Sequence, residues 1–114
     1  MERLEAIGPE SWREFLAAPR AVLMVGRATC PSCQAWTAEL TEFLAADTTW
    51  ADVRFGKLLL DQPGLVGFKR ANPWLAEVTS LPHNVLFKGG QLLRSYPGAG
   101  IDRLLTRLNR LRDG

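Results

Sequence analysis

The sequence predicts an α/β fold, with a central mixed β-sheet of four to five strands flanked by helices on both faces. A short, continuous apolar run at 21–26 is typical of a strand buried on both faces of a sheet, and 53–60 reads as a second buried strand. Segments with helical apolar spacing separate these runs, an order that favours parallel strands joined by helices. Two later runs, 85–88 and 91–96, flank Gly89-Gly90 and indicate an antiparallel hairpin.

The N-terminal half is expected to begin with a short strand near residues 4–7. A helix opened by Gly8-Pro9 follows, and Ser11 and Glu14 have the spacing of a capping box at its start. After the first buried strand, apolar residues recur at helical spacing from 31 to about 46, which predicts a long helix.

The C-terminal half follows the second buried strand with two short helical pieces, 65–70 and 73–78. Asn72 is expected to cap the second piece. After the hairpin, 101–111 reads as an amphipathic helix. Because 114 residues are too few for two domains, we expect residues 1–114 to form a single domain.

The composition is that of an ordinary globular protein, with 46% hydrophobic and 23% charged residues, and no stretch approaches the length of a membrane span. A net charge of +2 is too small to indicate nucleic-acid binding. The first residues lack a basic region followed by an apolar run, so the sequence predicts a cytoplasmic location and no membrane association. We expect a monomer.

The only two cysteines form the motif Cys30-Pro31-Ser32-Cys33, where the first buried strand leads into the long helix. Their spacing lets both thiols reach each other across one helical turn. A helix start at Cys30, which Pro31 favours, would stabilise the Cys30 thiolate through unpaired backbone N–H groups and the helix dipole. The pattern predicts a nucleophile, Cys30, with a built-in resolving partner, Cys33.

A metal site is the main alternative for this motif. A structural zinc site needs four ligands, and the chain offers two cysteines and one histidine, so we expect no metal. An intersubunit zinc or iron–sulfur site built from two copies stays open.

Several separated segments resemble the thioredoxin family. The Cys-x-x-Cys motif follows an apolar strand and starts a helix, and 55–64 is similar to the family's strand that ends in Asp before a Pro/Gly turn. Leu81-Pro82 followed by 85–90 resembles the family's cis-proline loop, strand and Gly turn, and Gly98 matches a later glycine. The resemblance covers most of the chain. It implies the thioredoxin fold, and no cofactor beyond a redox-active disulfide.

The resemblance also implies a function, thiol–disulfide oxidoreductase activity on protein substrates. Cys30 would attack a substrate disulfide, and Cys33 would then attack Cys30 and release the reduced substrate. Pro82 should follow a cis peptide bond and pack near the pair, so that the Leu81 backbone can pair with an extended substrate segment. An unidentified reductase or a low-molecular-weight thiol would regenerate the dithiol.

Some positions depart from the family's pattern. Met24 stands where thioredoxins carry a buried Asp that helps deprotonate the resolving thiol, so we expect slow resolution unless Lys57, His83 or water substitutes. Thr29 replaces the usual Trp before the first cysteine, and Pro-Ser replaces Gly-Pro between the cysteines. The segment 65–80 is longer than the family's norm.

Two supporting residues each have two interpretations. His83 can stabilise the Cys30 thiolate near neutral pH, or it is a loop histidine bonded to backbone. Lys57 can tune the Cys33 thiol, or it is a solvated lysine at a strand end. The function has alternatives too: an adaptor module with little redox turnover, or glutaredoxin-like reduction of glutathione mixed disulfides.

Overall fold

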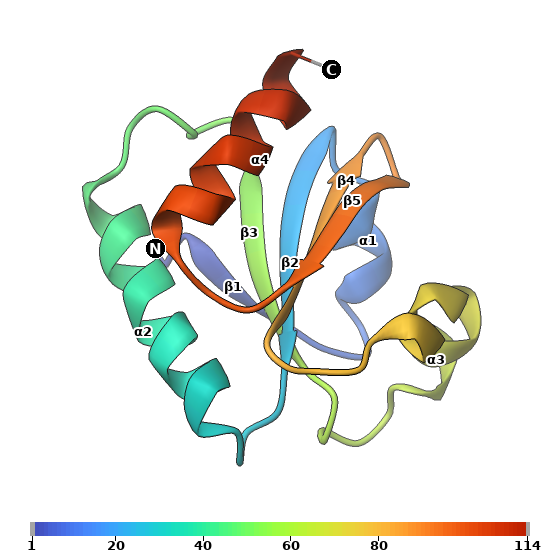
Figure 1. Ribbon diagram of the computed structural model, residues 1–114. Helices are drawn as coiled ribbons and strands as arrows, with labels where there is room; N and C mark the ends of the chain where they lie inside the picture. The colour runs from blue at the N-terminus through green and yellow to red at the C-terminus, as the bar shows by residue number, and fades with distance from the viewer. Residues whose placement is uncertain (1, 114) are drawn as a thin grey trace.

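The computed structural model describes residues 2–113 and is built around one five-stranded sheet with the order β1-β3-β2-β4-β5 (Figure 1). β3 pairs in parallel with both β1 and β2, whereas β4 pairs antiparallel with β2 and β5. The strands are β1 (Leu4–Ile7), β2 (Arg20–Gly26), β3 (Arg54–Leu59), β4 (His83–Lys88) and β5 (Gln91–Pro97). This mixed sheet confirms the predicted fold class.

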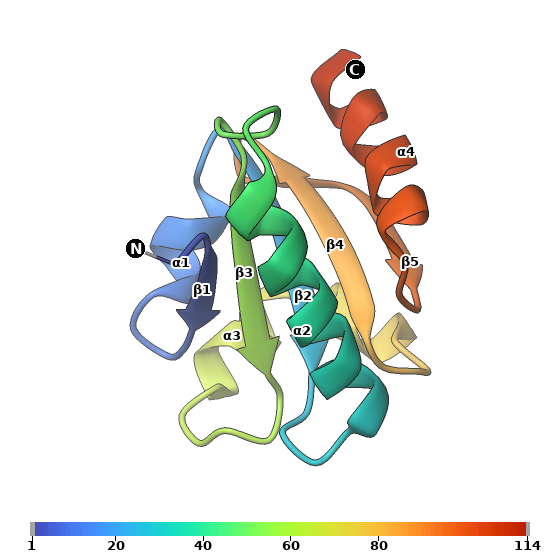
Figure 2. The ribbon, with the colours of Figure 1, turned by 90° about the vertical axis from the view of Figure 1, so that its left-hand side faces the viewer.

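Helices cover both faces of the sheet. Figures 1 and 2 show α2 and α4 on one face and α1 and α3 on the other. The helices are α1 (Trp12–Leu16), α2 (Pro31–Ala46), α3 (Val66–Ala71) and α4 (Ile101–Asp113), with a 3-10 helix, η1 (Pro73–Glu77), after α3. Among the described residues, no helix is long and apolar enough to cross a membrane.

The central strand β2 separates two apolar clusters, one under each helical layer. Alternate residues of a strand face opposite sides, so Met24 packs with Trp36 and Leu104 on the α2/α4 side, while Leu23 packs on the α1/α3 side with Phe68. All residues of β2 after Arg20 are buried. The continuous apolar run therefore has the physical cause predicted for it, burial on both faces.

The expected capping box at α1 is wrong. The Ser11 hydroxyl accepts a hydrogen bond from the backbone N–H of Gly8 at 3.0 Å and does not cap the helix. The Glu14 carboxylate pairs with the Arg54 guanidinium on β3. A full charge outside the helix is a stronger partner for a carboxylate than a neutral backbone N–H group.

Asn72 holds the N-cap position of η1, as expected, but its side chain makes no capping hydrogen bond to this helix. Its amide donates to the Phe68 carbonyl at 2.8 Å, and its side-chain oxygen accepts from the Trp74 indole N–H at 3.1 Å. The Asn72 side chain thus bonds to the last turn of α3 and not to the first turn of η1, so η1 is a 3-10 helix without a side-chain cap.

The hairpin turn was predicted correctly. Gly89 and Gly90 have φ values of 57° and 86°. Two successive positive φ angles match the right-handed twist of a tight hairpin, and glycine adopts them without a steric penalty.

Candidate active site

The site begins where β2 ends. β2 and β3 lie parallel, and their carboxyl ends meet at one edge of the sheet, where open α/β folds place their sites. Cys30 is the N-cap residue of α2 and Pro31 is its first residue, so the helix starts where the sequence predicted. The backbone N–H of Cys30 donates to the Arg27 carbonyl at 3.2 Å, which closes the turn between strand and helix.

The half-buried Cys30 thiol occupies the position of a capping side chain. Its Sγ accepts a hydrogen bond from the backbone N–H of Cys33 at 3.2 Å. The pKa of Cys30 is lowered, first by a hydrogen bond from the Cys33 thiol, and then by the N–H groups of Cys33 and Ser32 and the charge of Arg27, against the opposing effect of burial. These groups all stabilise the thiolate, which is the nucleophilic form.

Cys33, one turn later, is 1% exposed. Burial, the hydrogen bond with Cys30 and repulsion from the Cys30 thiolate raise the pKa of the Cys33 thiol to about 11. Gly26 of β2 leaves the room for this thiol, since a Cβ at Gly26 would lie 2.9 Å from Cys33 Sγ. Both cysteines are free thiols in this structure.

Met24 lies on the same side of β2 as Gly26 and is 1% exposed. Its Sδ and Cys33 Sγ both border the space in front of Gly26, so a thioether faces the resolving thiol from this side. A thioether is only a weak hydrogen-bond acceptor and does not take up a proton. Met24 therefore fills the site beside Cys33 without supplying a base.

Lys57 pairs with Met24 across the parallel β2–β3 ladder. It lines a small cavity of about 290 Å³ together with Cys33 and Thr37. The Lys57 ammonium can therefore reach the resolving thiol of Cys33 by way of this cavity.

The turn before Cys30 is held from two sides. Both carboxylate oxygens of Asp61 accept from the backbone N–H of Ala28, at 3.1 and 3.0 Å. The side-chain amide of Gln34, on α2, donates to the Ala28 carbonyl at 2.6 Å. These contacts fix the path of the chain between β2 and α2, and with it the position of Cys30.

The proline loop lies next to the cysteines. The Leu81–Pro82 peptide bond is cis, Pro82 is buried, and its carbonyl accepts from the Gly98 N–H at 2.8 Å. Leu81 and Cys30 line the same groove, which has a volume of about 800 Å³. The structure thus places Leu81 on the same groove as the nucleophile, whereas Pro82 is buried next to Leu81 in the chain and does not line that groove.

His83 is the first residue of β4 and is 9% exposed. Burial lowers the pKa of its imidazole, which favours the neutral ring at neutral pH. Within residues 2–113 the imidazole forms no hydrogen bond or ion pair with either thiol. Pro31 and Ser32, by contrast, are exposed at the tip of α2.

Sequence reasoning missed a buried polar link behind the site. The Trp36 indole N–H on α2 donates to the Asn84 side chain on β4 at 2.8 Å, and Asn84 in turn donates to the Gly98 carbonyl at 2.8 Å. Asn84 is 1% exposed. It joins the helix that carries the cysteines to the strand that follows Pro82. The available signal was an Asn directly before the apolar residues 85–87 of a predicted strand.

The described residues provide no set of metal ligands, because no three His, Cys, Asp or Glu side chains converge there. The arrangement instead pairs an activated outer thiol with a buried inner one. Such a pair can form a mixed disulfide through the outer sulfur and close an internal disulfide through the inner one.

Comparison with known proteins supports the fold. No family model and no curated protein sequence matches the chain. Thioredoxin f from spinach chloroplast superposes with a TM-score of 0.74 at 18% identity, covering 96% of this chain and 86% of that one. A thioredoxin from Malassezia sympodialis gives a TM-score of 0.76 at 15% identity, covering 96% and 91%.

Mitochondrial thioredoxin 3 from Saccharomyces cerevisiae gives 0.71 at 24% identity, covering 94% of both chains. The chain therefore has the thioredoxin fold, and the resemblance seen in its sequence is confirmed at that level. A Cys-x-x-Cys pair on a thioredoxin-like fold supports thiol–disulfide oxidoreductase chemistry in general terms.

Proposed function

We propose that this protein is a thiol–disulfide oxidoreductase that exchanges its dithiol with disulfides of protein substrates. One observation carries the proposal: Cys30 Sγ lies half-buried at the start of α2 and accepts the Cys33 N–H at 3.2 Å. The pKa of the Cys30 thiol is lowered there, while that of Cys33 is raised. The two cysteines therefore suit two different steps of one exchange reaction.

In the first step, the Cys30 thiolate attacks one sulfur of the substrate disulfide. A Cys30–substrate disulfide forms, and the other substrate sulfur leaves as a thiolate that takes up a proton. In the second step, Cys33 loses its proton and attacks Cys30 Sγ. The Cys30–Cys33 disulfide forms, and the second substrate thiol departs. Two electrons pass from the dithiol to the substrate, and no cofactor is needed.

Neighbouring residues have supporting roles in this proposal. Pro31 starts the helix, the Ser32 N–H stabilises the Cys30 thiolate, and Leu81 forms part of the wall on which an extended substrate lies. Pro82, buried next to Leu81 in the chain, holds the backbone of that wall in place. Lys57 is the residue best placed to exchange a proton with Cys33, through the cavity that both line.

His83 contributes through shape and not through charge, because burial lowers its pKa. It starts β4 directly after Pro82 and is held in the sheet between Val25 and Pro97. A neutral, buried ring at this position supports the proline loop from behind.

A second candidate is an adaptor that captures partners and turns over slowly. Met24 favours it, since this buried thioether supplies no base to the resolving thiol. In that case Cys30 would form mixed disulfides that Cys33 resolves only slowly.

The proposal includes the setting of the reaction. The chain acts as one domain and a monomer in the cytoplasm, and contributes to cell redox homeostasis. A reductase or a low-molecular-weight thiol returns Cys30–Cys33 to the dithiol. One sheet that joins all segments of the chain supports the single domain.

Trapping tests the proposal. Cys33→Ser protein incubated with disulfide-bonded peptides should accumulate a mixed disulfide through Cys30, detected by mass spectrometry of the tryptic fragment. The matched Cys30→Ser protein should not. Wild-type protein should release reduced peptide and end as the Cys30–Cys33 disulfide. A trapped species that wild-type protein never resolves would favour the adaptor, and the absence of any mixed disulfide would overturn both candidates.

A further inference from the structure

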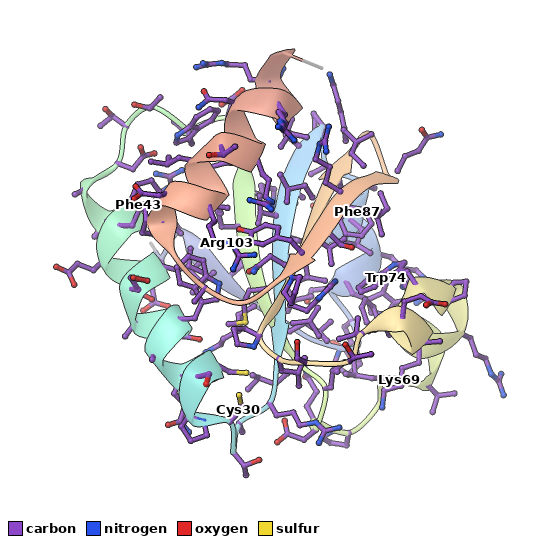
Figure 3. The ribbon with its side chains drawn as sticks, viewed as in Figure 1. Cys30, Phe43, Lys69, Trp74, Phe87 and Arg103 are labelled. Carbon is purple, nitrogen blue, oxygen red and sulfur yellow. The ribbon has the colours of Figure 1, made fainter. Side chains whose placement is uncertain are left out.

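The charged side chains that line the groove beside Cys30 are all positive. The groove runs between the turn that carries Arg27 and Cys30 and the segment 75–81, and Lys69 of α3 also lines it. Figure 3 shows Cys30 and Lys69 at the same end of the molecule. Its volume of about 800 Å³ makes it a large site next to the nucleophile.

Two cations line this groove, and none of the described residues that line it is Asp or Glu. Neither Arg27 nor Lys69 takes part in a salt bridge within residues 2–113. Their charges therefore face the groove without a carboxylate of the protein to neutralise them.

The nearest acidic residues lie outside the lining. Both oxygens of Asp61 are held by the Ala28 N–H. Glu77 is the last residue of η1, between two residues that do line the groove, but is not itself part of the wall. Asp61 and Glu77 keep their charges at the margin, and the described residues that form the wall itself carry only positive charges, although the net charge of the whole chain is only +2.

The remaining wall suits an extended peptide. Leu60, Leu75 and Leu81 give it an apolar part, and the exposed residues Thr79 and Ser80 lie outside any strand. Backbone groups that are not paired within a sheet can pair with an added extended segment. Such a segment would carry its side chains past both Cys30 and the two cations.

We propose that this groove selects disulfides borne on acidic peptide segments, with carboxylates beside the reacting cysteine that contact Arg27 and Lys69. This inference rests on the proposed oxidoreductase function and names its substrate class. Charge complementarity favours encounter with such segments and disfavours basic ones.

Matched peptides test this preference. Three disulfide-bonded peptides of one length would carry Asp/Glu, Ser/Asn or Lys beside the cysteine, and kcat/KM would be measured with the full chain. We expect the acidic peptide to react about fivefold faster than the neutral one and at least tenfold faster than the basic one at low ionic strength, since each exposed charge pair contributes little. The preference should shrink at about 1 M salt, where charges are screened within about 3 Å.

Charge reversal locates the preference. Lys69→Glu should lower the acidic-to-basic ratio by about tenfold, because an attraction becomes a repulsion. Arg110→Glu is the matched control. Arg110 is exposed in the last turn of α4. Figures 1 and 3 show the C-terminal end of α4 at the opposite end of the molecule from Cys30, so this variant should keep the ratio of wild-type protein. Lys69 serves better than Arg27 here, because Arg27 also influences the Cys30 thiolate.

A binding measurement separates the inference from the function it rests on. Peptides with Ser in place of Cys cannot react, and their affinity for the protein should follow the same order, acidic over neutral over basic. Failure to reduce any peptide, with this order of affinity intact, would overturn the oxidoreductase function alone. The inference would be overturned if the three peptides had equal rates and equal affinities. It would also be overturned if Arg110→Glu changed the acidic-to-basic ratio as much as Lys69→Glu, or if the protein reduced only glutathione mixed disulfides.

Discussion

Cys30 and Cys33 are the same residue type, one helical turn apart, in opposite surroundings. Cys30 caps the helix, accepts a hydrogen bond from the backbone N–H of Cys33 and lines the groove. Cys33 is buried under the same turn, beside Gly26 and Met24. The pKa is lowered for the first thiol and raised to about 11 for the second. The comparison shows that position along one helical turn, and not residue type, assigns the two roles.

Single-cysteine variants give the largest expected contrast. At neutral pH, Cys33→Ser protein, which keeps Cys30, should react with a small disulfide reagent at least about 100-fold faster than Cys30→Ser protein. The reason is that a smaller fraction of Cys33 is thiolate at neutral pH and that its buried sulfur is less accessible to the reagent. Stopped-flow absorbance measures both rates. Similar rates for the two variants would mean that the two environments do not differ in chemistry.

A base introduced at position 24 should accelerate the second step, the attack of Cys33 on the mixed disulfide. Met24→Asp places a carboxylate beside Cys33 and should speed release of peptide from the Cys30 mixed disulfide by about a hundredfold, the lower end of the range of general-base catalysis. The same change should lower the free energy of unfolding, since it buries an ionisable group. Met24→Leu, which keeps the volume but adds no base, is the control. An equal gain from leucine would assign the effect to packing.

Closing the space in front of Cys33 should disturb the packing around the inner thiol. In Gly26→Ala, the added Cβ would lie 2.9 Å from Cys33 Sγ. We expect an overpacking cost of about 2–3 kcal/mol in chemical denaturation. Gly89→Ala is a control at a glycine with no atom within 4 Å of an added Cβ, where only the positive φ is unfavourable. A fully stable Gly26→Ala protein would show that Cys33 is not confined.

The pH dependence of stability should have opposite signs in the two single-cysteine variants. Cys30→Ser protein keeps only Cys33, and burial, the largest cause of its raised pKa, remains, so the stability contribution is complete below pH 9.0 and is lost as the pH rises above it. Cys33→Ser protein keeps only Cys30. The new hydroxyl can donate in place of the Cys33 thiol, and the backbone N–H groups and Arg27 remain, so the pKa of Cys30 should stay lowered and its contribution should be present above the unfolded pKa and lost at lower pH.

Other titrating groups, Tyr96 among them, are common to both variants. The difference between the two unfolding curves across this range therefore isolates the cysteines. Parallel curves would contradict the opposite shifts.

The order of strands and helices could be predicted because it depends on local patterns. The apolar run in β2, the helical spacing in α2 and the glycine pair of the hairpin each carry their cause within a few residues. The start of α2 at Cys30 and Pro31 likewise follows from local helix chemistry. For the same reason, the position of the outer thiol could be expected before the structure.

Features that depend on distant partners could not be predicted. Glu14 pairs with Arg54, 40 residues away, and Trp36 binds Asn84 across 48 residues. No local rule shows which strand will bring such a partner within reach. The absence of Asp and Glu from the described lining of the groove has the same origin, because Arg27 and Lys69 come to line one groove only once the chain has folded.

The most direct test of the two-thiol account is the pH dependence of alkylation in fully reduced wild-type protein, followed at each cysteine by peptide mapping. The account predicts that Cys30 is modified with a midpoint below the ordinary thiol value of 9.0, while Cys33 stays unmodified until the pH approaches about 11. A midpoint for Cys30 at or above 9.0, or modification of Cys33 before Cys30, would contradict it.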